Sequence, residues 1–155
     1  MKALYAGSFD PFTIGHLSIV NRSLQLFESL VVAIGFNENK IGEWSVEERK
    51  KAITDYFRHN ERVQVAVYTG LTAEFAREIG AGVMIRGLRN GLDFDKEKDL
   101  ADINLQVLGI PTVFIPCDPS LSYVSSSMVR ELIHNGFDAS KFIVGNFPLQ
   151  DKISH

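Results

Sequence analysis

The stretch that decides the fold is Ala3-Leu4-Tyr5-Ala6-Gly7-Ser8-Phe9-Asp10-Pro11-Phe12-Thr13-Ile14-Gly15-His16. Its first four residues are apolar and predict a strand, and the residues after it carry apolar side chains at helical spacing. A helix start leaves backbone N–H groups without intrahelical partners and carries partial positive charge, so an anion is stabilised there. Gly7 and Gly15 let a ligand approach the backbone, and Ser8 and His16 add hydrogen-bond donors. The stretch therefore predicts a phosphate site between a strand and a helix.

Short segments rich in Val, Ile, Tyr and Phe alternate with segments of helical spacing along the chain. The strand-like segments are residues 2–6, 30–36, 62–68, 83–86 and 112–116. This alternation predicts a single α/β domain over residues 1–155, a Rossmann-like parallel five-stranded sheet with helices on both faces. Ligands gather beyond the carboxyl ends of such strands, so certain loops are expected to meet on one rim: 7–16, 37–42, 69–72, 86–91 and 117–127.

Each helical segment has an apolar stripe that should face the sheet. The second helix has a clear start, because Ser45 and Glu48 have the spacing of a capping box. The expected stripes are Leu17, Val20, Leu24 and Phe27 in the first helix, Val46, Ile53 and Phe57 in the second, Leu71, Phe75 and Ile79 in the third, and Leu100, Ile103 and Val107 in a long helix over residues 94–108.

The composition is that of an ordinary globular protein of 155 residues, 45% apolar and 23% charged, with a net charge of −3. An acidic chain is not expected to bind nucleic acid, so anionic ligands must be held by a local basic pocket. The chain has one cysteine, Cys117, and its start shows no secretory signal, which together predict a cytoplasmic location. Its apolar runs are shorter than the ~20 residues of a membrane span, so no membrane association is expected.

Two further segments carry groups suited to phosphate. Arg86-Gly87-Leu88-Arg89 ends the fourth predicted strand, where guanidinium groups can donate in pairs to phosphate oxygens. Leu121-Ser122-Tyr123-Val124-Ser125-Ser126-Ser127 follows the fifth strand and offers hydroxyls and free amides at a helix start. Serines at that position are also good helix caps, and an arginine pair on a surface is usually solvated charge.

The first stretch resembles the (T/S)-F-D-P-x-x-x-G-H segment of the nucleotidylyltransferase superfamily. Together with Arg-Gly-Leu-Arg and the triple serine, it resembles the pantetheine-phosphate adenylyltransferases over nearly the whole chain. Members of that family join ATP to 4′-phosphopantetheine, giving dephospho-coenzyme A and pyrophosphate. The resemblance implies the same activity in coenzyme A biosynthesis, Mg²⁺ accompanying ATP without dedicated protein ligands, coenzyme A as a feedback inhibitor, and a homohexamer.

The resemblance also implies roles for individual residues. It makes His16 and Lys40 the catalytic residues, both at the α-phosphate of ATP. The residues expected to bind ATP are Ser8, Phe9, His16, Gly87, Leu88, Arg89, Glu97, Leu121, Ser122, Tyr123, Val124, Ser125, Ser126 and Ser127. Those expected to bind the acceptor are Ser8, Lys40, Thr72, Arg86 and Asn104. Lys96 departs from the family, which often has an aromatic residue at its position.

Several of these residues have ordinary structural alternatives. A loop lysine such as Lys40 is most often solvated, Thr72 could begin a helix, Glu97 could lie on an exposed face, and Asn104 could be a satisfied core residue. Two other residues are interpreted as structural from the outset. Asp10 is expected to shape its own turn, because its carboxylate would repel a phosphate, and Arg130 is expected to be a surface charge. 

Other functions remain as alternatives. Another nucleotidylyltransferase, using nicotinate mononucleotide with ATP or glycerol phosphate with CTP, would share the first motif, but the cytidylyl enzymes usually end in Arg-x-x-Gly-Ile-Ser-Thr. A fragment of an aminoacyl-tRNA synthetase lacks room here for tRNA-binding domains. A non-catalytic adenine-nucleotide sensor could use the same fold, although binding alone would not need both His16 and Lys40.

Overall fold

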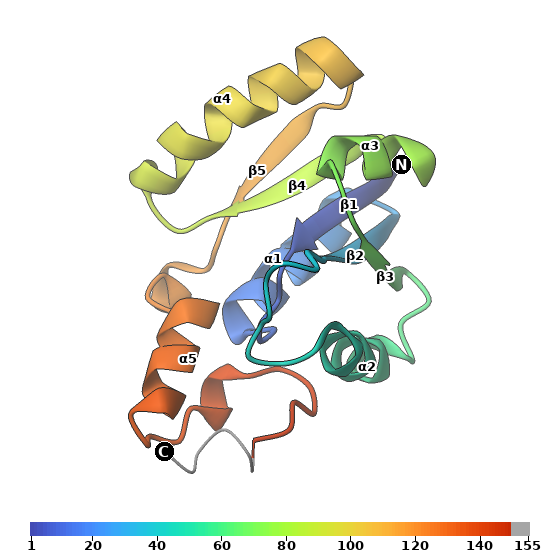
Figure 1. The fold of residues 1–155 in the computed structure, drawn as a ribbon. Helices are drawn as coiled ribbons and strands as arrows, with labels where there is room; N and C mark the ends of the chain where they lie inside the picture. The colour runs from blue at the N-terminus through green and yellow to red at the C-terminus, as the bar shows by residue number, and fades with distance from the viewer. Residues whose placement is uncertain (150–155) are drawn as a thin grey trace.

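The structure is a computed structural model that describes residues 1–149, apart from the side chains of residues 91–93 and 96, so the departure at Lys96 lies outside the described part. Its centre is a parallel five-stranded sheet in the order β3-β2-β1-β4-β5 (Figure 1). The strands are β1 (Lys2–Gly7), β2 (Ser29–Gly35), β3 (Val63–Tyr68), β4 (Val83–Leu88) and β5 (Thr112–Pro116). The predicted fold class is confirmed, and the predicted strands agree with the observed ones to within two residues.

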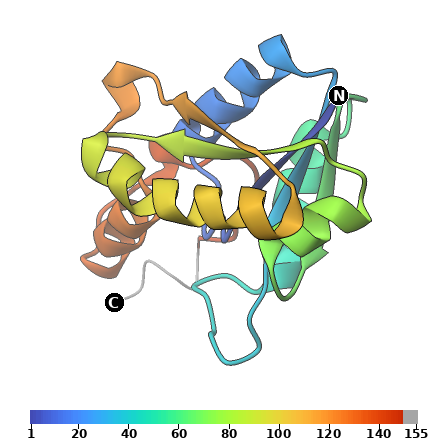
Figure 2. The same cartoon turned by 90° about the horizontal axis from the view of Figure 1, so that it is seen from above.

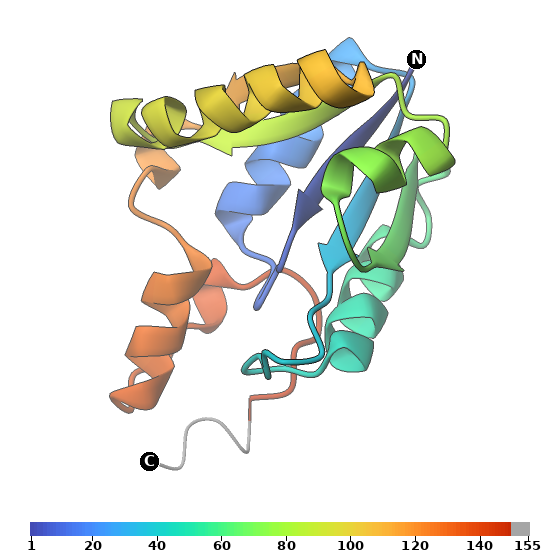
Figure 3. The ribbon, with the colours of Figure 1, turned by 45° about the horizontal axis from the view of Figure 1, so that its top comes forward.

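Helices cover both faces of the sheet. On one face lie α1 (Ile14–Leu26) and α2 (Val46–Phe57), and on the other lie α3 (Thr72–Glu78) and α4 (Gly91–Leu108). Figures 2 and 3 show α4 lying along β4 and β5. The last helix, α5 (Ser126–His134), lies beyond the carboxyl ends of the strands, between the short 3-10 turns Pro119–Leu121 and Ser140–Phe142. No helix in residues 1–149 is long and apolar enough to cross a membrane.

The two faces of the sheet bury cores of different character, because successive residues of a strand point to opposite faces. Tyr5 of β1 belongs to a large core that also packs α1, α2 and α5, and that contains the buried aromatic residues Phe9, Phe12, Trp44, Phe57, Phe142 and Phe147. Leu4 of β1 points to the opposite face, where the core is small and rich in alanine: Ala6, Ala33, Ala73, Ala76 and Ala81. The side that carries α1, α2 and α5 therefore holds the larger core.

The first two helices begin and pack as the sequence predicts. Ser45 accepts a hydrogen bond from the backbone of Glu48, and the Glu48 side chain bonds back to Ser45, which confirms the capping box. In α1, Val20 is fully buried, and its predicted neighbours Leu17, Leu24 and Phe27 pack partly buried against the same core. In α2, Ile53 and Phe57 are buried, with Val46 packed beside them.

The other two helices depart from the predicted stripes, α3 in part and α4 completely. Leu71 precedes α3 and is 66% exposed, whereas Phe75 and Ile79 of the predicted stripe pack partly buried against the alanine-rich core, beside the buried Ala73 and Ala76. In α4 the expected stripe is exposed, at 53% for Leu100, 57% for Ile103 and 73% for Val107. The partly buried positions of α4 are instead Glu97, Ala101, Asn104 and Leu108. Helical periodicity shows that apolar side chains share a face, but not what covers that face.

Candidate active site

A cavity of about 340 Å³ lies at the carboxyl ends of β1, β4 and β5. Three segments line it, namely the loop from β1 into α1, the end of β4, and the connection from β5 into α5. Its lining residues are Tyr5, Ala6, Gly7, Ser8, Phe9, Thr13, Gly15, His16, Ile19, Arg86, Gly87, Leu88, Arg89, Cys117, Leu121, Val124, Ser125, Ser126, Ser127 and Arg130. None of these is an aspartate or glutamate, whereas three are arginines. The cavity therefore suits an anionic ligand.

Most of the residues predicted to bind ATP meet in this cavity. They are Ser8, Phe9, His16, Gly87, Leu88, Arg89, Leu121, Val124, Ser125, Ser126 and Ser127, and the predicted acceptor residue Arg86 joins them. Six predicted residues do not line it: Lys40, Thr72, Glu97, Asn104, Ser122 and Tyr123. Of the five loops expected on one rim, those around residues 7–16, 86–91 and 117–127 meet here, and those at 37–42 and 69–72 do not border the cavity.

His16 is held as a neutral side chain in one orientation. The backbone N–H of Thr13 donates to Nδ1 of His16 at 2.9 Å, and the Thr13 hydroxyl lies 3.1 Å from the same nitrogen. Since Nδ1 accepts, the ring proton of neutral His16 sits on Nε2. Burial, and secondarily the positive charge of Arg89, lower the pKa of His16 from 6.5 to about 4. At neutral pH, His16 therefore offers an uncharged Nε2–H donor.

Thr13 has a role that was not predicted from the sequence, although a signal was present. Its hydroxyl accepts from the backbone N–H of His16 at 3.3 Å, so the two residues form a reciprocal capping box at the start of α1. A capping box usually pairs Ser or Thr with a Glu or Gln three residues later. Here histidine takes the place of the acid, and the helix cap fixes a residue of the cavity wall.

The loop before α1 is shaped by Phe9, whose backbone adopts a positive φ of 47°. Such a conformation is uncommon for a residue other than glycine and is held here by packing. The Phe9 ring is 2% exposed and meets the ring of His16 edge-on, at 5.0 Å between centroids. It also explains Gly7, because a Cβ there would lie 3.1 Å from the tip of the Phe9 ring. Phe9 thus contributes to the cavity by packing against two of its lining residues, Gly7 and His16.

Arg86 is bound to Glu97 of α4 through two hydrogen bonds. Its Nε and Nη2 donate to the two carboxylate oxygens of Glu97 at 3.0 and 2.8 Å, and Nη1 donates to the carbonyl of Ala6 at 3.3 Å. This fork-to-fork geometry fixes the plane of a guanidinium group. Glu97 therefore orients Arg86 from outside the cavity.

The three serines have different roles. Ser125 is the N-cap of α5, accepting from the backbone N–H of Met128 at 3.1 Å, and the Ser126 hydroxyl donates to the carbonyl of Pro11 at 2.8 Å. Both expected roles, helix cap and anion cradle, are therefore compatible. The cap uses the Ser125 hydroxyl, while Ser126 and Ser127, the first residues of α5, line the cavity, and the backbone N–H groups of a helix start suit an anion.

Arg130 is not the surface charge that the sequence suggested. Its side chain reaches back one turn along α5 to the cavity, where Nη2 donates to the Ser127 hydroxyl at 3.2 Å and Nη1 to the carbonyl of Asp10 at 2.7 Å. The available signal was its place on α5, one turn after the serines. Residues three or four apart on a helix share a face.

Lys40 and Thr72 follow two adjacent strands of the sheet, β2 and β3. Lys40 is exposed on the loop between β2 and α2, where its backbone N–H donates to the carbonyl of Asn37 at 3.0 Å. Figure 2 shows this loop extending away from the sheet. Thr72 opens α3, and its hydroxyl lies 2.6 Å from the hydroxyl of Tyr68. Asn104 is partly buried on the sheet-facing side of α4.

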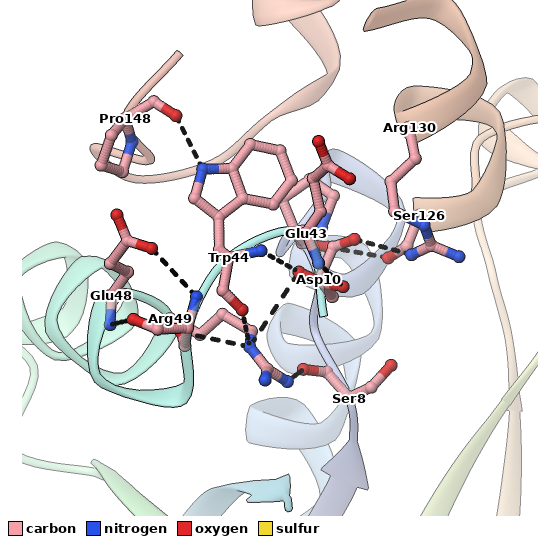
Figure 4. Close-up of polar contacts among 11 residues, drawn as sticks. Ser8, Asp10, Glu43, Trp44, Glu48, Arg49, Ser126, Arg130 and Pro148 are labelled. Carbon is pink, nitrogen blue, oxygen red and sulfur yellow. Dashed lines mark hydrogen bonds and ion pairs between the residues drawn. The ribbon is translucent and has the colours of Figure 1, made fainter. Parts of the chain in front are cut away.

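Asp10 has a wider structural role than shaping its own turn. Its carboxylate accepts from the backbone N–H groups of Glu43 at 2.8 Å and Trp44 at 2.9 Å, more than thirty residues away (Figure 4). The expectation of a local turn contact was therefore wrong about the partner. Asp10 is not among the residues that line the cavity.

The described residues do not build a site for a metal ion. They contain no group of three or more His, Cys, Asp or Glu residues that could hold one, and the cavity wall has no carboxylate. Mg²⁺ prefers carboxylate, phosphate and water oxygens. The protein residues of this cavity therefore do not fit a Mg²⁺ site made by the chain itself.

Fold and cavity together define a nucleotidyltransferase, and the family model described as cytidylyltransferase-like matches residues 4–132. The phosphopantetheine adenylyltransferase of Porphyromonas gingivalis is 46% identical over 147 residues, which are 95% of this chain and 96% of that protein. That of Cutibacterium acnes is 40% identical over 157 residues, covering both proteins completely. The chain belongs to the phosphopantetheine adenylyltransferase family.

A solved structure shows the same fold at much lower sequence identity. The bifunctional NMN adenylyltransferase/ADP ribose pyrophosphatase of Francisella tularensis superposes with a TM-score of 0.71 at 13% identity. The match covers 92% of this chain and 44% of that longer protein. At this identity the likeness concerns the fold alone.

Proposed function

We propose that this chain transfers the adenylyl group of ATP to 4′-phosphopantetheine, giving dephospho-coenzyme A and pyrophosphate. The observation that carries the proposal is the cavity, which joins a neutral histidine donor, three arginines and a helix start without a carboxylate in its wall. Relatives that are 40–46% identical over most of the chain and bear the name phosphopantetheine adenylyltransferase support it. The enzyme takes part in coenzyme A biosynthesis.

The reaction needs no protein nucleophile. The 4′-phosphate of the acceptor is mostly dianionic at neutral pH, because its second pKa is about 6. One of its oxygens attacks the α-phosphorus of ATP, and the bond from that phosphorus to the bridging oxygen breaks in line as pyrophosphate leaves. Catalysis then consists of bringing two anions together and stabilising the charge that develops on the α-phosphate.

In this proposal His16 donates its Nε2–H to the α-phosphate. A neutral donor suits this position because its tautomer is fixed before the substrate arrives, so no reorganisation accompanies the reaction. Lys40, on its exposed loop, moves toward the α-phosphate and the acceptor phosphate when both substrates are bound. Ser8 assists from the loop that begins α1.

The far end of the nucleotide is held by the other two segments. Arg89, Arg130 and the first N–H groups of α5, at Ser126 and Ser127, bind the β- and γ-phosphates that leave as pyrophosphate. Gly87, Leu88 and the segment 121–125 bind the rest of ATP. Mg²⁺ arrives bound to the phosphates of ATP, since the described residues give it no carboxylate ligands.

The acceptor is proposed to lie between the cavity and the sheet-facing side of α4. Arg86 binds the acceptor phosphate in the plane that Glu97 fixes, and Asn104 and Thr72 contact the pantetheine arm. This assignment moves Glu97 from nucleotide binding to the orientation of Arg86, because both of its carboxylate oxygens are engaged there. Coenzyme A, which contains the same arm, is proposed to inhibit by competing for this position.

The chain is further proposed to work as a homohexamer in the cytoplasm. The exposed apolar residues of α4, Phe94, Leu100, Ile103, Leu105 and Val107, support burial of this helix against another copy, because exposed apolar side chains gathered on one element mark interaction surfaces. The single cysteine, Cys117, is a free and buried thiol, which is compatible with a reducing compartment.

The test is pyrophosphate release from ATP in the presence of different acceptors. With 4′-phosphopantetheine we expect pyrophosphate and dephospho-coenzyme A in equal amounts. Nicotinate mononucleotide is the control acceptor and should give a rate at least about a hundredfold lower, because the site would leave its polar groups unpaired. Equal or faster turnover with nicotinate mononucleotide, or nucleotide binding with no pyrophosphate from either acceptor, would overturn the proposal.

A further inference from the structure

Arg49 of α2 is a buried arginine outside the cavity wall, with a side chain 7% exposed. Its Nε donates to the carbonyls of Trp44 at 3.0 Å and Ser45 at 3.3 Å, and its Nη1 donates to the carbonyl of Ser8 at 2.8 Å. Nε also lies 4.0 Å from Oδ1 of Asp10 (Figure 4). One guanidinium group thus binds both the loop that begins α1 and the loop that begins α2.

Asp10 joins the same two loops from the opposite direction. Its carboxylate accepts from the backbone N–H groups of Glu43 and Trp44, and its carbonyl accepts from Arg130 of α5 at 2.7 Å. Asp10 is 7% exposed, so these bonds are shielded from water. The segment around Trp44 is therefore held at its N–H groups by Asp10 and at its carbonyls by Arg49.

The close approach of Asp10 also explains a glycine in the second loop. A Cβ at Gly42 would lie 2.7 Å from Oδ2 of Asp10 and 3.1 Å from the carbonyl oxygen of Trp44. Both neighbours are fixed by hydrogen bonds, so the loop would have to move away. Gly42 lies two residues after Lys40, which places this contact point next to the lysine in the chain.

A buried ion pair is weak evidence for stability, because the cost of removing two charges from water offsets most of their attraction. Arg49 and Asp10 are instead arranged to determine geometry. Every partner that their side chains bind belongs to the segment 8–10 or the segment 43–45. The first segment leads into the turn before His16, and the second follows the loop that carries Lys40. Neither Arg49 nor Asp10 lines the cavity, so neither is a catalytic residue.

We propose that Asp10 and Arg49 form a positioning pair that sets the loop carrying Lys40 relative to the loop carrying His16. The inference rests on the proposed role of Lys40 at the α-phosphate. An error of about 1 Å in the placement of a reacting group can lower a rate by about a hundredfold, so an anchor near the base of an exposed loop has a kinetic effect without touching substrate. ATP binding, which depends on the cavity wall, is affected little.

Arg49→Lys tests the pair. Lysine keeps the charge but cannot reproduce a planar fork that binds carbonyls of two loops at once. We expect kcat to fall by about tenfold or more, with the Kd of ATP changed less than about threefold. Arg58→Lys is the matched control on the exposed end of the same helix and should leave both values unchanged. A Kd that rises as much as kcat falls, or an unchanged kcat, would overturn the proposal.

A double-mutant cycle with Lys40→Ala separates positioning from general damage. In the unaltered chain, Lys40→Ala is expected to lower kcat by about a hundredfold, but in the Arg49→Lys chain by less than about tenfold, because misplaced Lys40 has already lost most of its effect. An equal loss in both chains would contradict the positioning role while leaving the role of Lys40 intact. No loss in the unaltered chain would remove Lys40 from the mechanism, and the inference with it.

Gly42→Ala provides a second variant should Arg49→Lys unfold. It leaves Asp10 and Arg49 in place but displaces the loop, and we expect the same pattern of lowered kcat with little change in the Kd of ATP. Circular dichroism and thermal melting establish that each variant is folded before its kinetics are read. Full turnover in folded Gly42→Ala would contradict the proposal.

Discussion

The two faces of the sheet differ in how completely this one chain fills them. On the side of α1, α2 and α5, aromatic side chains fill a large core, and the cavity residues are held by hydrogen bonds, as His16 is by Thr13. On the side of α3 and α4, the core is small and alanine-rich, and Leu100, Ile103 and Val107 face outward. The first side holds its cavity residues in place, and we propose that it binds the triphosphate of ATP. The second side exposes apolar side chains that we propose another copy of the chain covers.

The difference explains where each class of residue acts. Groups that stabilise a transition state work best when they are fixed in advance in a shielded site. The proposed nucleotide side offers such groups through helix starts and a half-buried histidine whose Nδ1 accepts from Thr13. The α4 side offers the ion pair of Arg86 with Glu97, beside a helix that exposes several apolar side chains.

The largest effect is expected from His16→Ala, on the organised side. Removing one fixed donor costs about 3 kcal/mol of transition-state stabilisation, which lowers kcat about a hundredfold. The Kd of ATP should change little, because the arginines and the start of α5 remain. Single-turnover kinetics and a separate nucleotide titration measure the two quantities. Unchanged turnover would show that the fixed orientation of His16 serves the fold and not the reaction.

A smaller effect is expected from Arg130→Ala on the same side. Hydrogen bonds to charged groups contribute about 1.5–3 kcal/mol, so the Kd of ATP should rise at least about tenfold. Arg77→Ala removes the same charge from an exposed position on α3 and should leave the Kd unchanged. An equal response of the two variants would mean that Arg130 acts only through the net charge of the protein.

On the other side, Glu97→Gln should have a modest effect confined to the acceptor. The Arg86 to Glu97 pair is partly exposed, and such pairs contribute up to about 1 kcal/mol, so the KM for 4′-phosphopantetheine should rise roughly threefold to fivefold. The matched control is Asp102→Asn, which breaks an exposed ion pair with Lys98 on the same helix. A change in the KM for ATP, with the KM for 4′-phosphopantetheine unchanged, would show that Glu97 acts in nucleotide binding.

The smallest effect on the folded chain itself is expected from Ile103→Glu. Ile103 is 57% exposed, so its replacement should change the free energy of unfolding of the single chain by less than about 0.5 kcal/mol. The mass measured by light scattering should nevertheless fall, because a charge would enter the surface proposed to face another copy. Gln106→Glu, at another exposed position of α4, is the control. An unchanged mass would contradict assembly through this face.

Part of the candidate site could be predicted from the sequence. The strand order of a doubly wound sheet brings the loops after β1, β4 and β5 to one rim, so Ser8, His16, Arg89 and Ser126 could be placed together in advance. Each of these residues belongs to a motif that lies at the end of a strand. That position at the end of a strand, together with the topology of the sheet, was enough to predict that these four residues lie together.

Three features could not be predicted, for different physical reasons. The outward stripe of α4 has the periodicity of a buried one, and periodicity does not identify the partner. The fixed tautomer of His16 depends on the direction of one backbone N–H at Thr13. The contacts of Asp10 reach residues 43 and 44, and no local pattern reports a bond across thirty residues of chain.

The pKa of His16 leads to a prediction about stability. It is about 4 in the folded protein against 6.5 for an unperturbed histidine. As pH falls, the unfolded chain therefore takes up a proton before the folded one does. The stabilisation from neutral His16 is complete above pH 6.5 and is lost progressively toward pH 4. Urea unfolding of His16→Gln should show a shallower loss of stability across this interval than the unaltered chain.

The most direct test of an organised nucleotide side is a pH titration of the unliganded protein followed by the ¹⁵N resonances of His16. We expect the ring to remain neutral from pH 8 down to about pH 5, with the proton on Nε2 and with Nδ1 accepting from Thr13. A midpoint near 6.5, or a proton on Nδ1, would show that His16 is not fixed as a neutral donor before ATP binds.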